Sequence, residues 1–308
     1  MTTPKLSVIV LTDRFATIQR VVDHLSAQTI AGDIELVIGC PVRDELQMPT
    51  DVTFSLARVT VIEVPLLPAG TARATAVRAA SAPVVVIGET HAFPAPEWAS
   101  LLVHAHLGSW GSVAPGMVNA NPETARSWAA FLMDYGRWLA VRPKGQIAEP
   151  PAYNASWKLA ALLSVGERLP AMLDPAGALD SALAKEGRFH HEPRAHVEHL
   201  NVVSPKAWMV ERYCGGRLLG AHRRRRWPLW RRVIYAGGSW LIPIVLLLRS
   251  RQALTLARRT TRIPRGTFPI LVAASLLWAL GEGLGYLAGP GQAEARMMEY
   301  EVNKEKYA

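Results

Sequence analysis

The sequence has few cysteines and comparatively few acidic residues. Only Cys40 and Cys214 are present among 308 residues, which excludes a disulfide framework and fits a reducing compartment. A strand pattern begins within a few residues of Met1, so we expect no signal peptide. Internal repeats, low-complexity segments and a GxGxxG loop are also missing. These absences favour an intracellular α/β enzyme or binding protein without a dinucleotide-type phosphate loop.

Positive charge exceeds negative charge and is unevenly distributed. Lys and Arg number 34 against 25 Asp and Glu, for a formal net charge of +9. Much of the excess lies in residues 217–265, where arginine runs at 223–226 and 231–232 stand beside apolar segments rich in Trp and Leu. Such a pattern fits the cytoplasmic face of an anionic membrane better than nucleic acid. We expect a membrane surface and no nucleic acid as partner; a solvated basic helix face is the alternative.

Short apolar runs alternate with helical patterns in the first third of the chain. We expect strands at residues 6–11, 34–39, 59–64 and 84–87, and an amphipathic helix at residues 16–28. Such alternation predicts an α/β fold with a mostly parallel sheet flanked by helices. The chain is long enough for one large domain with an appendage.

The stretch from Gly70 to Trp98 contains the most informative pattern. It predicts a helix capped by Thr71, a stop at Pro83, and a buried strand over residues 84–87. Glu89, Thr90 and His91 follow the strand after one glycine. Ligands of open α/β sheets bind at the carboxyl ends of strands, so these three side chains are candidates for chemistry.

This stretch resembles the family-two glycosyltransferases, which are inverting, nucleotide-sugar-dependent enzymes of GT-A fold. Ala72-Arg73 matches the Ala-Arg-Asn helix motif of that family, with Ala74 in place of Asn, and Trp98 matches the tail. Glu89-Thr90-His91 stands where the family has Asp-x-Asp. The resemblance covers about residues 5–220 and implies a GT-A-like, Rossmann-like domain over 1–220. Residues 221–308 are expected to form a basic, apolar, helical membrane-association region and polar tail.

The altered Asp-x-Asp motif leaves three interpretations open. In the family, these carboxylates hold a divalent cation that neutralises the diphosphate leaving group. Glu89 offers an oxygen ligand and His91 a nitrogen, a combination that suits Mn²⁺ better than Mg²⁺. His199 matches a histidine that ends a later strand in the family, so Glu89, His91 and His199 form the candidate metal site. Metal-free catalysis by Arg or His charge, and loss of catalysis, are the other interpretations.

The resemblance also implies donor-binding residues and a catalytic base. Thr12 and Asp13 match the family's first loop, and with Arg73, Glu89, Thr90 and His91 they form the predicted donor-binding set; a helix cap is the alternative role for Asp13.

Inverting sugar transfer needs a carboxylate that accepts the proton of the acceptor hydroxyl. Asp174 lies nearest the family position of this base, and Asp180 is the second candidate. Each could instead be a loop or helix-cap acid.

Two apolar segments follow in the last third of the chain. Residues 233–248 are short for a membrane span and contain Pro243, whereas residues 267–288 are long enough but include Glu282. Arginines on both sides of the first segment predict that both its ends stay cytoplasmic. We expect it to lie in the interface or re-enter, with the second segment packed beside it or spanning. Two buried helices of a soluble dimer are the alternative.

The resemblance and the charge pattern together predict a function. We expect an inverting glycosyltransferase of the hexosyltransferase type that uses a nucleotide-sugar donor and a divalent metal. Its acceptor is expected to be lipid-linked or a cell-envelope glycan, at the cytoplasmic face of the inner membrane. The alternative is a catalytically inactive family member that acts as a glycan-binding or membrane-complex scaffold. A nucleotidyltransferase would need a basic, glycine-rich phosphate loop near the N-terminus, which is missing.

Overall fold

The computed structural model describes residues 3–49, 55–174 and 188–308, and these form two compact units. The first unit comprises residues 1–118 and 142–199, and the second comprises residues 119–141 and 200–308. Residue 220, the predicted domain boundary, falls inside a helix of the second unit, α8 (Pro205–Arg224). Asp180 lies outside the described residues, so its role as base or cap stays a prediction.

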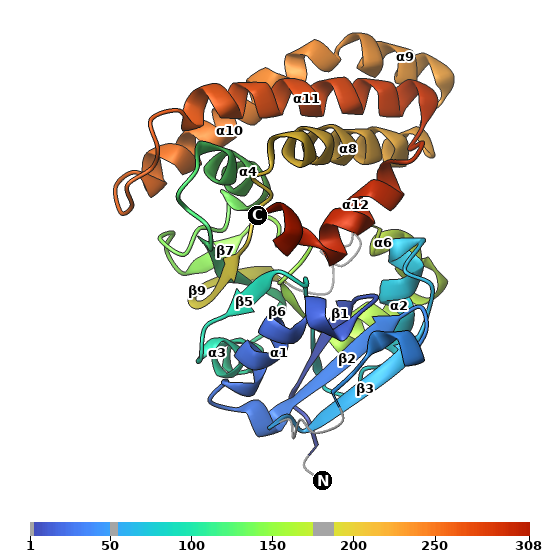
Figure 1. Ribbon diagram of the computed structural model, residues 1–308, viewed down its shortest axis with the longest axis vertical. Coiled ribbons are helices and arrows are strands. Elements are labelled where there is room, and N and C mark those ends of the chain that lie inside the picture. The colour runs from blue at the N-terminus through green and yellow to red at the C-terminus, as the bar shows by residue number, and fades with distance from the viewer. Residues whose placement is uncertain (1–2, 50–54, 175–187) are drawn as a thin grey trace. The chain divides into compact units, whose positions relative to one another are not determined.

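The first unit is built on a mixed sheet that, in the described residues, has nine strands in the order β3-β2-β1-β4-β8-β6-β9-β5, with β7 paired to β9 (Figure 1). The strands are β1 (Leu6–Leu11), β2 (Ile34–Cys40), β3 (Arg58–Glu63), β4 (Val84–Ile87), β5 (Ala92–Pro94), β6 (Trp110–Asn119), β7 (Gly145–Ile147), β8 (Ser156–Lys158) and β9 (Arg188–His199). The predicted α/β fold is confirmed.

The four N-terminal strands of the described residues pair in parallel. β1 pairs in parallel with both β2 and β4, and β2 pairs in parallel with β3. β4–β8, β6–β8, β5–β9 and β7–β9 are antiparallel, so the sheet is less parallel than the sequence pattern indicated. All residues of β1, β2 and β4 are buried, as expected for central strands covered on both faces. Because β1 and β4 run in parallel, their carboxyl ends lie at one edge of the sheet.

The helices of the first unit connect these strands. They are α1 (Gln19–Ser26), α2 (Ala69–Ala79), α3 (Trp98–Ala105), α5 (Leu159–Ser164) and α6 (Leu169–Met172). α2 begins two residues before the expected cap at Thr71, because the carbonyl of Pro68 already accepts the N–H groups of Thr71 and Ala72. Thr71 therefore lies inside the helix. The prediction of a Thr71 cap is wrong for this reason.

The second unit is helical. It contains α4 (Ala125–Tyr135), α8, α9 (Leu229–Gly237), α10 (Ile242–Ala257), α11 (Thr267–Ala288) and α12 (Ala293–Val302). α11 lies between α8 and α9 and also contacts α4 and α10 (Figure 1). By length and composition, residues 239–257 and α11 could each cross a membrane, with mean hydropathies of 1.3 and 1.6. The expected apolar segment 233–248 is divided between α9, a short 3-10 turn at Ser239–Leu241, and α10.

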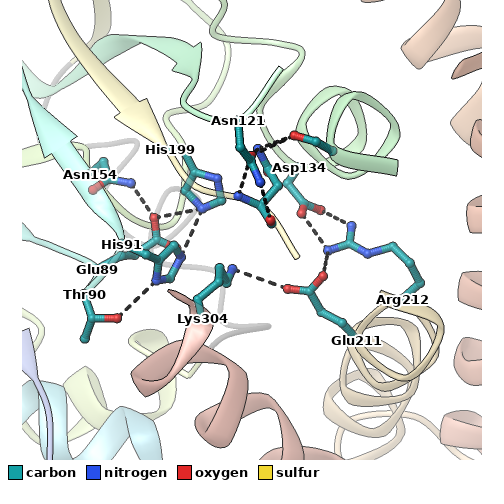
Figure 2. A network of polar contacts seen from close by, with 12 residues as sticks. Glu89, Thr90, His91, Asn121, Asp134, Asn154, His199, Glu211, Arg212 and Lys304 are labelled. Atoms are coloured by element: carbon teal, nitrogen blue, oxygen red, sulfur yellow. Dashed lines mark hydrogen bonds and ion pairs between the residues drawn. The ribbon is translucent and has the colours of Figure 1, made fainter. Parts of the chain in front are cut away.

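A buried ion-pair network holds α4, α8 and the C-terminal turn of the second unit together (Figure 2). Arg212 donates to both carboxylate oxygens of Asp134, at 2.7 and 2.8 Å, and to Glu211 at 2.9 Å. Lys304 lies 3.3 Å from the other oxygen of Glu211. Burial by itself raises the pKa of Glu211, but Arg212 and Lys304 outweigh burial and hold this pKa below its usual value. The carboxylate is therefore kept ionised in the interior.

Candidate metal centre

Three buried side chains follow the central strand β4 at its carboxyl end. Glu89, Thr90 and His91 are at most 4% exposed. The four apolar residues of β4 fix the strand in the middle of the sheet, and Gly88 donates its N–H to the carbonyl of Ile9 in β1. The chain turns directly after this bond, and the next strand, β5, begins at Ala92. The predicted site is therefore fixed by sheet pairing on both sides.

Sheet register brings His199 to the same place. β5 pairs antiparallel with β9, and Ala92 lies opposite His199, the last residue of β9. His91 precedes Ala92, so the two imidazoles meet with their Nε2 atoms 3.1 Å apart (Figure 2). Burial alternates along the end of β9: Ala195, Val197 and His199 are buried while Glu198 is exposed.

Glu89 completes the cluster with both carboxylate oxygens. Its Oε1 lies 3.6 Å from Nε2 of His91, and its Oε2 lies 3.5 Å from Nε2 of His199. Metal–ligand bonds of about 2.0–2.2 Å at tetrahedral angles place ligand atoms about 3.3–3.6 Å apart. Two of the three separations, 3.5 and 3.6 Å, fall within that range, and the third, 3.1 Å between the two imidazole nitrogens, is slightly shorter. In the described residues these are the side chains whose His, Cys, Asp and Glu ligand atoms converge as a possible metal site.

Two neighbouring polar side chains orient the ligands. The side-chain amide of Asn154 donates to Oε2 of Glu89 at 2.6 Å (Figure 2). Oγ1 of Thr90 lies 3.2 Å from Nδ1 of His91. If Nδ1 carries the proton and donates it to Thr90, the Nε2 lone pair points at the cluster, as in metal sites where an outer partner fixes the tautomer. Thr90 thus positions a ligand.

The donor set decides which cations fit. Two neutral imidazoles and one carboxylate suit first-row transition metals, including Mn²⁺ and Zn²⁺, whereas Mg²⁺ prefers oxygen ligands throughout. Three protein ligands leave a further coordination position for water or substrate. Glu89, His91 and His199 therefore fit a divalent cation, with Mn²⁺ favoured over Mg²⁺. Such an ion would supply positive charge beside a phosphate leaving group.

A cavity of about 150 Å³ lies in the same unit and contains two predicted site residues. Arg73 and Asp174 both line it, together with Ile87, the last residue of β4, and Glu149. Nη1 of Arg73 donates to the carbonyl of Leu173 at 3.5 Å, and its guanidinium carbon lies 4.7 Å from the centre of the Tyr153 ring. The structure thus brings one cation and two carboxylates to one cavity at the end of β4.

Gly70 allows the first turn of α2 to approach the residues before Asp174 closely. A Cβ at Gly70 would lie 2.1 Å from the carbonyl oxygen of Pro170 and 2.9 Å from the backbone nitrogen of Asp174. Both distances are shorter than real Cβ contacts permit, so only glycine lets the first turn of α2 touch residues 170–174. The close contact sets Arg73, one turn later in α2, against Leu173.

Thr12 and Asp13 lie at the carboxyl end of β1, and the contacts of their side chains described below are with residues close by in the sequence. The Thr12 hydroxyl is buried and lies within hydrogen-bond distance of the Arg14 carbonyl, at 2.9 Å, and of the Thr17 hydroxyl, at 2.5 Å. Asp13 lies 3.7 Å from Arg14. The cap positions of the following turn and helix are Arg14 and Ile18, neither with a side-chain cap bond. The alternative that Asp13 caps this helix is therefore wrong; its donor role stays a prediction.

Sequence reasoning missed the contributions of Asn154 and Glu149. Asn154 lies in an Asn-x-Ser segment, which by itself indicates no contact with Glu89. In the structure its N–H donates to the Ile87 carbonyl and its φ is +64°, a left-handed conformation that Asn tolerates better than most residues. Glu149 precedes two prolines and gave no periodic signal. Neither role could be found without the pairing of β4 with β8.

Comparisons with known proteins identify similar solved structures. No protein-family model and no curated protein matches the chain. The mannosyltransferase PcManGT from Pyrobaculum calidifontis, solved with GDP-Man and Mn²⁺, is 16% identical over 97% of this chain and 79% of its own, with a TM-score of 0.46. TarS from S. aureus is 15% identical over 96% of this chain (TM-score 0.46), and GalNAc-T7 with UDP, GalNAc and Mn²⁺ is 13% identical over 65% (TM-score 0.47). This chain spans 55% of TarS and 44% of GalNAc-T7.

Proposed function

We propose that the protein is an inverting glycosyltransferase that transfers a hexose from a nucleotide-sugar donor. The observation that carries the proposal is the convergence of Glu89, His91 and His199 at the carboxyl end of β4. A nucleoside diphosphate leaving group carries concentrated negative charge, and Glu89, His91 and His199 would hold a divalent cation that could neutralise it.

The remaining residues have distinct tasks in this proposal. Arg73 presents a fixed guanidinium to the cavity, where it stabilises the donor diphosphate. A carboxylate, Asp174 or Asp180, accepts the proton of the acceptor hydroxyl as its oxygen attacks the anomeric carbon. The bond from that carbon to the diphosphate oxygen breaks as the new bond forms on the opposite face, and the sugar is inverted. Thr12 and Asp13 bind the nucleoside at the end of β1.

The second unit supports a proposal for the acceptor and the location. Apolar helices and clustered arginines favour an acceptor held at a membrane, so the acceptor is a lipid-linked or cell-envelope glycan. The catalytic unit then faces the cytoplasm at the inner membrane, where nucleotide sugars are available. In this arrangement the protein needs no nucleic-acid partner.

Calorimetric titration of the purified protein tests the donor and metal sites together. UDP, GDP and their sugar conjugates are titrated in the presence of Mn²⁺ or of a chelator. We expect one nucleotide class to bind only with Mn²⁺. Glu89→Gln and His199→Gln should each lower Mn²⁺ affinity at least tenfold, and Asn154→Ala should lower it about tenfold through its effect on the Glu89 carboxylate.

Two exposed residues of the same unit provide matched controls. Glu97→Gln and His104→Gln remove the same chemical groups outside the cluster and should leave Mn²⁺ affinity unchanged. Unaltered Mn²⁺ binding in Glu89→Gln would contradict the metal centre. A protein that binds Mn²⁺ but no nucleotide would instead support the scaffold alternative.

A further inference from the structure

Large apolar side chains are exposed on α9, α10, α11 and the turn between α9 and α10. Trp230, Ile234, Trp240, Leu248, Leu276 and Leu280 are each more than half exposed, and we call them the apolar surface. α11 contacts α9, α10 and the turn, so these elements form one helical layer (Figure 1). An apolar groove of about 550 Å³, lined by residues of α9 and α11, opens in it. Soluble monomers rarely leave so much contiguous apolar area in water.

The charge around the apolar surface identifies what covers it. Residues 212–281 contain fourteen arginines and neither Asp nor Glu. Arg226, Arg249 and Arg251 are exposed on or beside the same helices. Anionic lipid headgroups complement such a ring of cations, and the acyl chains beneath them complement the apolar side chains. Nucleic acid would complement only the charge and would leave the tryptophans in water.

Close packing between α8 and α11 determines how deeply this layer can enter a bilayer. Gly216 and Gly220 of α8 face Gly281 and Gly285 of α11, in two matching GxxxG motifs. A Cβ at any of the four would lie within 2.0 to 2.3 Å of a backbone carbonyl of the other helix. The two backbones are therefore in contact, and α11 cannot enter the bilayer core without α8.

α8 is too polar to follow α11 across hydrocarbon. It carries Lys206, Glu211, Arg212, Arg217, Arg223 and Arg224 within 20 residues. Glu282, the single acid of α11, faces α8. Its carboxylate accepts hydrogen bonds from Arg223 of α8 at 2.6 Å and from Trp278 of α11 at 3.1 Å. Moving this many charges into hydrocarbon would cost more free energy than the burial of the apolar face of α11 in lipid would gain.

α10 is also unsuited to cross the bilayer. Together with the preceding 3-10 turn it reaches 19 residues, close to the length of about 20 that a span needs, but Arg249 and Arg251 lie within it and would enter hydrocarbon. Only one side of α11 and the outer sides of α9 and α10 remain available for lipid.

We propose that the second unit docks in the plane of an anionic bilayer as a monotopic anchor. The apolar surface enters the boundary between headgroups and acyl chains, the arginines contact lipid phosphates, and neither α10 nor α11 crosses. This inference deepens the membrane association in the proposed function and concerns a different unit from the metal centre. Its test needs neither donor nor metal, so either proposal can fail without the other.

Vesicle flotation of the full chain tests the docking surface. Vesicles of phosphatidylcholine alone are compared with vesicles that also contain phosphatidylglycerol. We expect binding at least tenfold stronger to the anionic vesicles, and a loss of at least tenfold in Ile234→Glu and in the double variant Arg249→Ser with Arg251→Ser. Leu107→Glu and Arg78→Ser alter exposed residues of the first unit and should bind like the wild type. Equal binding by Ile234→Glu and the wild type would overturn the proposal.

Cysteine labelling separates a monotopic anchor from a span. Arg265→Cys and Gln292→Cys place an exposed thiol beyond each end of α11, and the native Cys40 and Cys214 are buried. The full chain is synthesised in the presence of sealed anionic vesicles and treated with a membrane-impermeant maleimide. Both new thiols should react from outside, with detergent as the control for full reactivity. Protection of one end until detergent is added would show that α11 crosses, and would overturn the proposal.

Discussion

At the residue scale, His106 shows how a buried imidazole constrains the protein. It follows α3, is 8% exposed, and its Nε2 lies 2.9 Å from the Ser156 hydroxyl. Burial, reinforced by the positive charge of Lys158, lowers the pKa of His106 to about 4. The unfolded chain therefore binds a proton between about pH 6.5 and 4 that the folded chain does not bind.

The consequence is a loss of stability in acid. As pH falls from 6.5 toward 4, this residue should reduce the free energy of unfolding, by roughly 2–3 kcal/mol at pH 4.5. Urea denaturation of the wild type and of His106→Gln at pH 7 and pH 4.5 measures the effect, because glutamine can keep the hydrogen bond without titrating. His104→Gln, on the exposed side of α3, is the control for removing a histidine. An identical pH dependence in His106→Gln and the wild type would contradict this prediction.

At the element scale, the backbones of α8 and α11 lie in direct contact. Gly216 and Gly285 have their nearest neighbours among backbone atoms of the other helix, and so do Gly220 and Gly281. Glycine normally weakens a helix by about 1 kcal/mol relative to alanine. Its presence four times at one contact indicates that close approach outweighs helix propensity.

Gly281→Ala should therefore destabilise the second unit. The new Cβ would lie 2.0 Å from the Tyr213 carbonyl oxygen, a backbone atom that cannot move alone. Overpacking of about 1–3 kcal/mol exceeds the gain in helix propensity, so we expect a net loss of about 1–2 kcal/mol. Gly237→Ala, at the end of α9, has nothing within 4 Å of the new Cβ and should be neutral or slightly stabilising. Thermal unfolding in mild detergent compares the two, and equal midpoints would contradict the close contact.

At the scale of the whole molecule, the second unit is assembled from two separate parts of the chain. Residues 119–141 and 200–308 form it together, and α11 contacts both α4 and α8. The ion-pair network adds Lys304, close to the C-terminus, to Asp134 and Arg212. The C-terminal third is thus part of the core of this unit and not a separable appendage.

Truncation after residue 220 should for this reason fail to give a native second unit. A fragment of residues 1–220 retains α4 and most of α8 but loses α11, α12 and Lys304. In the fragment, the face of α4 that packs against α11 would be exposed, and Glu211 would lack its ion pair with Lys304. We therefore expect the fragment to aggregate or to lose cooperative unfolding. Near-ultraviolet circular dichroism and limited proteolysis, compared with the full chain in the same detergent, measure this. A fragment that stays monomeric and resists protease like the full chain would contradict the prediction.

The sequence by itself determined the elements that depend on local pattern. Continuous apolar runs predicted β1 and β4 at their observed bounds, and the apolar run of α11 predicted residues 267–288. Glu89 and His91 were found because they follow a buried strand directly, whereas His199 was found by its match to a histidine that ends a strand in the resembled family. These signals are local: side-chain polarity repeats with the period of the helix or strand that carries it.

The tertiary structure decided what depends on contacts between distant segments. The pairing of β5 with β9 sets the distance between His91 and His199, and the pairing of β4 with β8 brings Asn154 to Glu89. The contact of α8 with α11 shows that a helix of spanning length has one side occupied by a charged neighbour. No local pattern encodes these contacts, because register and packing are fixed by the fit of surfaces that lie far apart in the chain, 108 residues for His91 and His199.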